Sequence, residues 1–250
     1  MYSNHIYHTY IIGAFHKFPE PVAKELRKAL FYTNQDLRPH DALKYYKKAL
    51  RISEEIGMDP FSDEILGVKI QMAAFFEKID EYEKSIQVLE IVKRDCLTWI
   101  EELGSKPENI SSGKRTKVLA KTVQISTKLG ELYSSQYVMR KDEAEKNLVW
   151  AVETALRELI RRQTEGVKEG EGPWMDRDSI GATMEALGNN YEEKDMHDLA
   201  APLFLQAINL SPPNSCHTAV LSKFIVAGEG REEVSSSGNT HASTSADKSK

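Results

Sequence analysis

Residues 186–212 read ALGNNYEEKDMHDLAAPLFLQAINLSP, and this stretch decides the fold. Its landmarks are three small residues, two aromatic residues and a proline: Gly188, Ala200, Ala207, Tyr191, Phe204 and Pro212. Small residues at helical spacing let two helix backbones approach closely, aromatic side chains fill the space between the helices, and proline stops a helix. The stretch therefore predicts two short antiparallel helices, with Pro212 ending the second.

This order of landmarks is typical of the tetratricopeptide repeat (TPR), and the same unit recurs upstream. The small residue of each predicted first helix is Ala29, Ala73, Gly130 or Gly188. The landmarks of the second helices are Ala42, Tyr46 and Ala49, then Ser85, Leu89 and Val92, then Ala144, Leu148 and Ala151, and finally Ala200, Phe204 and Ala207. The fold class predicted is an all-α TPR superhelix, an α-solenoid of about four irregular repeats.

The repeats depart from the usual TPR period of about 34 residues. Successive small residues of the first helices lie 44, 57 and 58 residues apart. The excess falls in long second helices, over residues 82–103 and 142–164, and in the Gly- and Pro-containing loops 104–113 and 166–173. We therefore expect helix ends that protrude from the array.

Composition bounds the class of protein. The chain has 250 residues, of which 40% are hydrophobic and 28% charged, and a net charge of −5, as expected for a soluble globular domain without a nucleic-acid footprint. Its cysteines, Cys96 and Cys216, are too few for a disulfide framework and are expected to be buried or half-buried thiols. The predicted organisation is an apolar arm over residues 1–17, a TPR domain over 18–223 and a disordered polar tail over 224–250.

The arm contains an apolar, aromatic stretch at residues 7–15 that is too short to cross a membrane. Three interpretations are open: the end of a membrane segment that lies upstream, an interfacial anchor, or a hydrophobic arm that packs on the first helix. A secretory signal is disfavoured, because no basic region or small-residue cleavage site frames the stretch.

No set of residues indicates catalysis. Residues 166–172, GVKEGEG, lack the Lys-Ser/Thr pair of a phosphate-binding loop and are expected to form an exposed hairpin between helices. His5 and His8 have no acidic or cysteine cluster nearby, and Cys216 directly precedes His217, which prevents chelation from one helix face. The sequence predicts no enzyme, no metal site and no cofactor, with protein partners rather than nucleic acid or a small-molecule substrate.

First helices line the concave face of a TPR array, where peptides or partner helices bind. The candidate groove residues are Arg27, Asn34, Gln71, Lys78, Lys128, Glu131, Glu185, Asn189 and Glu192. The alternative for each is an ordinary solvated position. Chaperone-tail TPR domains hold a C-terminal carboxylate with two Asn, two Lys and one Arg, and this set is not reproduced here. Residues 114–121 form at most a modest basic face, with a solvated surface as the default.

Several blocks of the sequence carry a resemblance to a known family. They include FPEPVAKELRKALFYTN at residues 18–34, GKRTKVLAKTV at 113–123, VWAVET at 149–154, EGVKEGEG at 165–172 and APLFLQAINLSPPNSCH at 201–217. Further blocks lie at residues 42–50 and 55–71. Together the blocks resemble fungal TPR-domain proteins related to the adaptor subunit of the mitochondrial i-AAA protease supercomplex.

The resemblance implies a non-catalytic subunit at the mitochondrial inner membrane, facing the intermembrane space, that passes unfolded or misfolded proteins to an AAA protease for degradation. The family's transmembrane helix precedes the arm and is not found in this sequence, so membrane association is expected only with an upstream anchor. The family also continues with further helices where this chain becomes polar, so we expect the last repeat to expose an apolar face. The alternative function is a general cytosolic TPR scaffold or co-chaperone that binds peptides in its groove.

Overall fold

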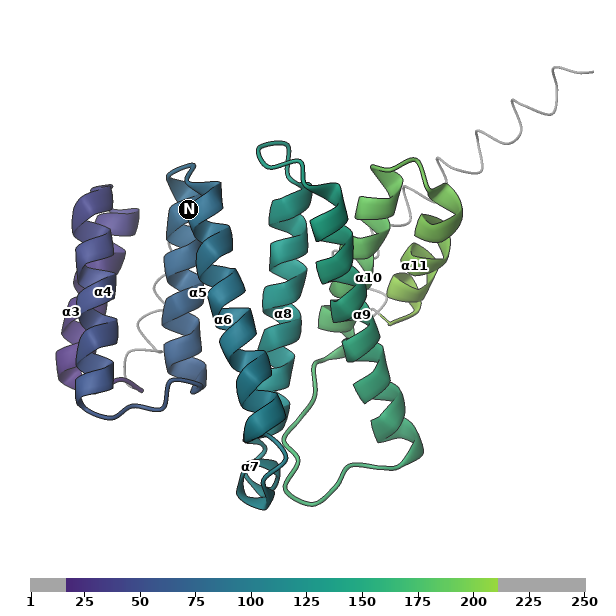
Figure 1. The fold of residues 1–250 in the computed structure, drawn as a ribbon, viewed down its shortest axis with the longest axis horizontal. Helices are drawn as coiled ribbons and strands as arrows, with labels where there is room; N and C mark the ends of the chain where they lie inside the picture. The colour runs from purple at the N-terminus through teal and green to yellow at the C-terminus, as the bar shows by residue number, and fades with distance from the viewer. Residues whose placement is uncertain (1–16, 211–250) are drawn as a thin grey trace, which may run out of the picture. The chain divides into compact units, whose positions relative to one another are not determined.

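The computed structural model describes residues 17–210, and every regular element in this part of the chain is a helix (Figure 1). The helices are α3 (Glu20–Asn34), α4 (Pro39–Glu55), α5 (Asp63–Lys78), α6 (Tyr82–Glu102), α7 (Pro107–Ser111), α8 (Lys114–Ser134), α9 (Lys141–Thr164), α10 (Arg177–Glu192) and α11 (His197–Leu210). The chain divides into two compact units, one up to Met175 and one from Asp176. The predicted all-α class is confirmed.

The helices pack in the pairs that the repeat pattern predicts. In the first unit α3 packs on α4, α5 on α6 and α8 on α9, and in the second unit α10 packs on α11 (Figure 1). The small residue of each first helix and the three landmarks of each second helix are all buried, from Ala29 in α3 to Ala207 in α11. The TPR-like repeat fold is therefore confirmed at the positions that predicted it.

Local chemistry explains where several helices begin. Pro39 is the first residue of α4, where a missing N–H costs nothing. The Ser62 hydroxyl accepts a hydrogen bond from the Ile65 N–H at the start of α5, and the Asp176 carboxylate accepts one from the Ser179 N–H at the start of α10. These caps satisfy backbone donors that would otherwise lack an acceptor.

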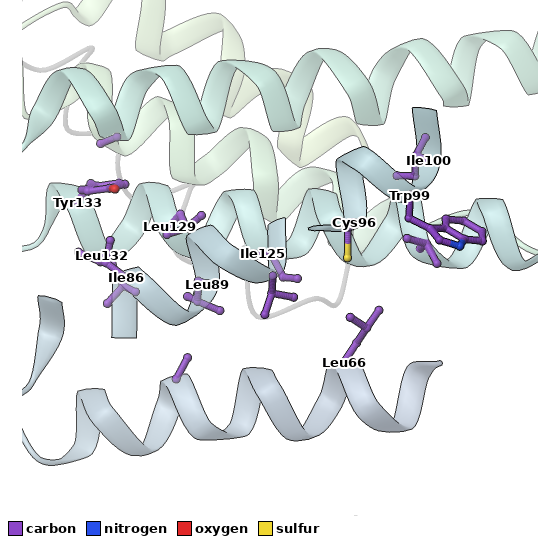
Figure 2. Close-up of a cluster of buried hydrophobic side chains, with 14 residues drawn as sticks. Leu66, Ile86, Leu89, Cys96, Trp99, Ile100, Ile125, Leu129, Leu132 and Tyr133 are labelled. Carbon is purple, nitrogen blue, oxygen red and sulfur yellow. The ribbon is translucent and has the colours of Figure 1, made fainter. Parts of the chain in front are cut away.

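The first unit has two hydrophobic clusters that meet at α5. One cluster is built by α5, α6 and α8, and Figure 2 shows its members Leu66, Ile86, Leu89, Cys96, Trp99, Ile100, Ile125, Leu129, Leu132 and Tyr133. The other joins α3 and α4 to α5 through Val68, Phe75 and Phe76. Because α5 contributes to both clusters, it links the first two repeats. Cys96 is a buried free thiol, as expected, whereas Cys216 lies outside the described residues.

The long second helices are confirmed, but the loops beside them differ from the prediction. Residues 104–113 were expected to be a loop and contain the short helix α7, which Pro107 starts. In the segment 166–172, which was expected to be exposed, residues 166–170 are exposed but Glu171 and Gly172 are half-buried. Gly172 packs on Gly113, so the segment lies against the start of α8 instead of standing free as a hairpin.

Two groups of predictions lie outside the described residues: the arm at residues 1–16, and Pro212, the Cys216–His217 pair and the polar tail. Between residues 17 and 210, no helix combines the length and the apolar character that a membrane span requires. In α11, Leu199 and Leu205 are 45% and 50% exposed, so this helix carries an apolar outer face in the structure as described.

Candidate functional site

The helix α5 leaves one stripe of its surface uncovered. Gly67, Gln71, Ala74 and Lys78 follow one another at helical spacing, and each is exposed or half-buried. The two hydrophobic clusters take up the flanks of the helix and leave this stripe open. A β-carbon built on Gly67 would meet nothing within 4 Å. Small residues at 67 and 74 therefore bring the helix backbone close to the surface.

The neighbouring first helices carry comparable stripes. On α3 the stripe consists of Arg27, Phe31 and Asn34, and on α8 it consists of Lys121, Gln124, Lys128 and Glu131. Together with the α5 stripe, we call these residues the first-helix face. Phe31 is 48% exposed, which gives a largely polar surface one large apolar side chain. The face is mixed in charge, as the sequence predicts.

Lys78, at the end of the α5 stripe, hydrogen-bonds to the C-terminal end of α3. Its Nζ donates to Asn34 Oδ1 at 3.0 Å and to the Thr33 carbonyl oxygen at 2.7 Å. The last carbonyls of a helix have no partner within the helix and carry partial negative charge, so a lysine is a favourable partner there. Two of the predicted groove residues, Asn34 and Lys78, thus form one polar contact between repeats.

Lys128 makes the corresponding contact one repeat further on. Its Nζ lies 3.0 Å from Glu77 Oε2 on α5 and 3.7 Å from Glu131 Oε2 on its own helix. Glu77 also accepts a hydrogen bond from Ser85 Oγ on α6 at 3.4 Å. A series of polar contacts therefore runs along the C-terminal ends of α3, α5 and α8.

The predicted groove residues fall into separate groups in the structure. Asn34, Lys78, Lys128 and Glu131 lie along this series of contacts. Arg27 instead holds Glu20 on its own helix with two hydrogen bonds, at 2.9 and 3.1 Å, and its hydrogen bond lowers the pKa of Glu20.

The remaining predicted positions are Gln71, which is half-buried in the middle of the α5 stripe, and three residues of α10. Glu185, Asn189 and Glu192 are half-buried or exposed on α10, in the second unit. Within the part of the chain that the structure describes, no three His, Cys, Asp or Glu side chains converge as metal ligands would.

Sequence reasoning missed Glu77 and Phe31. Glu77 directly precedes Lys78 and points to the next repeat, whereas Lys78 points to the previous one. Only the structure could show that Glu77 contacts α8 and Lys78 contacts α3, because this depends on how α5 is turned about its own axis between the two helices. Phe31 lies four residues after Arg27 and three before Asn34, so helical spacing could have identified it.

Comparisons with known proteins agree with the helical-repeat fold. A TPR repeat-containing protein of Schizosaccharomyces pombe is 24% identical over 209 residues, which are 82% of this chain and 49% of the relative. The chain is thus similar in sequence to a TPR repeat protein over most of its length. Protein MRG3-like of Saccharomyces cerevisiae is 29% identical over 120 residues, 47% of this chain and 25% of that protein. The chain thus spans half or less of the length of these curated relatives, and no family model matches it.

Among solved structures, BtubC (BKLC) from P. vanneervenii matches with a TM-score of 0.50 and 20% sequence identity. The match covers 91% of this chain and 71% of BtubC. At this identity the likeness establishes the fold alone, and it supports the helical-repeat architecture over most of the chain.

Proposed function

We propose that the chain is a non-catalytic, protein-binding TPR adaptor. The observation that carries the proposal is the first-helix face, where three successive first helices leave aligned stripes uncovered and small residues expose the middle of α5. An extended peptide can lie along such a surface, since its main-chain groups can hydrogen-bond to polar side chains such as Gln71 and Gln124 whatever the peptide's sequence. The polar contacts between repeats hold the three stripes in fixed register.

The mixed charge of the face suits clients that share no sequence motif. Lys78 and Lys128 already have carboxylate, amide or carbonyl partners, so neither is a free charge that would select one type of ligand. Exposed Phe31 and Ala74 offer apolar contact. This combination favours segments of unfolded proteins over a single defined peptide tail.

We further propose that the clients are passed to an AAA protease at the mitochondrial inner membrane. The support is the resemblance of seven sequence blocks between residues 18 and 217 to the fungal i-AAA adaptor proteins. Unfolding and peptide hydrolysis would then belong to the protease, and this chain would contribute binding alone. A general cytosolic TPR scaffold or co-chaperone is the second candidate, because the first-helix face would serve it equally well.

Crosslinked affinity purification of the tagged chain, with mass spectrometry, separates the two candidates. The adaptor proposal expects AAA protease subunits among the main partners, together with unfolded proteins. Enrichment of cytosolic chaperones without any AAA protease would contradict it and favour the second candidate.

A blocking variant tests the face itself. Ala74→Trp places an indole on the exposed middle of α5 without removing any polar contact, and Gln87→Trp places the same indole on the exposed surface of α6. We expect crosslinked client to fall about tenfold in the first variant and to stay at the wild-type level in the second. Equal client capture by both variants would exclude the first-helix face as the binding surface.

A further inference from the structure

A cavity of about 730 Å³ lies away from the first-helix face, between the start of α8 and the long end of α9. Its walls include Arg115 and Leu119 of α8, Trp150, Arg157 and Arg161 of α9, and Ile110 of α7. Leu119 and Lys128 are nine residues apart on α8, which is two and a half helical turns, so they lie on opposite sides of the helix. The cavity and the first-helix face are therefore separate surfaces of α8.

Three sequence blocks outside the first two repeats come together at this cavity. Residues 113–123 contribute Arg115, residues 149–154 contribute Trp150, and residues 165–172 contribute Lys168. Arg115 lies in the extra length at the start of α8, and the lining residues Arg157 and Arg161 lie beyond the last landmark of α9. The extra helix length that lengthens the repeat therefore helps to form the cavity.

Hydrogen bonds hold the end of the segment 165–172 in place, where it forms one wall of the cavity. Arg161 Nη2 donates to both carboxylate oxygens of Glu171 at 2.7 and 2.8 Å, and Arg162 Nη1 donates to the Gly172 carbonyl oxygen at 2.9 Å. A β-carbon on Gly113, whose φ is +67°, would stand 2.7 Å from the Gly172 nitrogen. Glycine at 113 therefore permits the close backbone contact as well as the left-handed conformation.

Positive charge exceeds negative charge around the cavity. The cationic side chains that line it are Arg115, Arg157, Arg161 and Lys168, and the acidic ones are Glu158, Glu165 and Glu171. Arg162, behind the wall, also pairs with Glu158 and Glu171. Glu158 and Glu171 are therefore paired within the protein, and Lys168 lies 3.9 Å from Glu165. Arg115 has no such partner among the described residues, and the partner of Arg157 is 4.0 Å away.

Arg115 and Arg157 line the cavity without a close carboxylate partner. Arg115 is half-buried, and no side-chain hydrogen bond or ion pair joins it to another residue between positions 17 and 210. Arg157 lies 4.0 Å from Glu153 Oε2 and its side chain is 77% exposed. Arg161, in contrast, is already held by Glu158 and Glu171. A carboxylate can accept paired hydrogen bonds from an arginine, so an anionic ligand near Arg115 and Arg157 would be stabilising.

The rest of the cavity wall is apolar. Ile110, Leu119 and Ile160 line it together with the Trp150 indole, and Ile160 is 54% exposed. The Lys93 ammonium lies over the Trp150 ring at 5.0 Å and its Nζ donates to Asn147 Oδ1 at 2.7 Å, which together fix the ring. A ligand for this site should therefore combine a carboxylate with an apolar side chain.

We propose that this cavity binds an acidic peptide segment of a partner protein, with a carboxylate near Arg115 and Arg157 and an adjacent aromatic or aliphatic side chain against Trp150. A planar carboxylate matches the fork of donors on arginine, and the indole provides the apolar surface. The site goes beyond the proposed client-binding face and does not depend on it. It would give the chain a second docking position, so that two partners can be held at once.

Fluorescence anisotropy with the full chain tests the proposal. The probe is a fluorescein-labelled peptide in which glutamates flank a central phenylalanine. One matched peptide has glutamines in place of the glutamates, and another has serine in place of the phenylalanine. We expect saturable binding of the first peptide, weakened about tenfold by either replacement.

Paired variants locate the binding. Arg115→Gln with Arg157→Gln should weaken the acidic peptide about tenfold or more. Lys84→Gln with Lys117→Gln removes the same charge from exposed positions outside the cavity and should leave the affinity within about twofold. Leu119→Ala should weaken the phenylalanine peptide and leave the serine peptide unchanged.

Ala74→Trp, which blocks the first-helix face, should leave binding of the acidic peptide intact, so that failure of the proposed function and failure of this site are distinguishable. The absence of saturable binding would overturn the site. Equal binding of the glutamine peptide, or an unchanged affinity after the arginine substitutions, would also overturn it.

Discussion

Leu148 of α9 packs directly on Gly130 of α8, so closely that a β-carbon at position 130 would overlap the leucine side chain. The second unit repeats the relationship, because a β-carbon on Gly188 would stand 2.6 Å from Phe204 Cε1. Each pair joins the small residue of a first helix to the large central landmark of the second. Contact between these two positions sets how closely the helices of a repeat approach, so it is the physical basis of the repeat pattern.

Gly130→Ala should therefore destabilise the protein. The added methyl group must displace Leu148, which is 1% exposed and has no space to move into, and overpacking of this kind costs about 1–3 kcal/mol. Gly67→Ala is the matched control, since that glycine is also inside a helix but has nothing near its β position. It should raise the free energy of unfolding by about 0.5–1 kcal/mol. Urea denaturation measures both, and equal effects would refute the packing argument.

The sequence predicted the repeat core because that core depends on spacing within each unit. The small residues of the first helices and the three landmarks of each second helix are buried as expected, since size and periodicity are local properties of the chain. The wall formed by Glu171 and Gly172 could not be predicted in the same way. Its partners, Gly113 and Arg161, lie 59 and 10 residues earlier, and glycine-rich, charged composition predicts an exposed loop by default.

The candidate groove was predicted only in part for a related reason. Spacing along α5 identifies the stripe that contains Gln71 and Lys78, but it does not show which neighbouring helix each end of the stripe faces. Lys78 turned out to contact α3 and Glu77 to contact α8. Contacts between repeats depend on how each repeat is rotated relative to the one before it. In a regular TPR array this rotation is the same at every step, but the unequal repeat lengths of this chain do not allow that assumption.

Lys78→Met should loosen the junction between the first two repeats. The substitution keeps an apolar stem of similar length and removes the donor to Thr33 O and Asn34 Oδ1, so the free energy of unfolding should fall by about 1–2 kcal/mol. Lys84→Met removes the same charge from an exposed pair within α6 and should change stability by no more than about 0.5 kcal/mol. Chemical denaturation distinguishes them. Similar values for the two variants would mean that the contact between repeats contributes nothing.

Glu171→Gln should remove one pH-dependent contribution to stability in the acidic range. Burial alone raises the pKa of Glu171, but hydrogen bonds from Arg161 and from the Lys168 N–H outweigh it and hold the pKa below its ordinary value of 4.5. A carboxyl group with a depressed pKa in the folded state stabilises the fold above its unfolded pKa and loses that contribution as the pH falls through the folded value. The wild type should therefore exceed the variant by about 1–3 kcal/mol at pH 7.

This difference should disappear as the pH drops well below 4.5. Denaturation of both proteins across the acidic range tests the expectation. Glu169→Gln, two residues earlier and fully solvated, provides the control and should match the wild type throughout. A constant gap between the wild type and Glu171→Gln at all pH values would show that ionisation of Glu171 is not what holds the wall.

Cys96 should react with thiol reagents only when the core opens. The side chain is completely buried in the cluster shared by α5, α6 and α8, and burial raises the pKa of the thiol, so the reactive thiolate is scarce. In a Cys216→Ser variant, labelling by Ellman's reagent then reports Cys96 alone. We expect the rate to rise steeply with urea in parallel with global unfolding, because Cys96 sits at the junction of two repeats. Fast labelling in the absence of denaturant would instead show that these repeats separate locally while the rest of the chain stays folded.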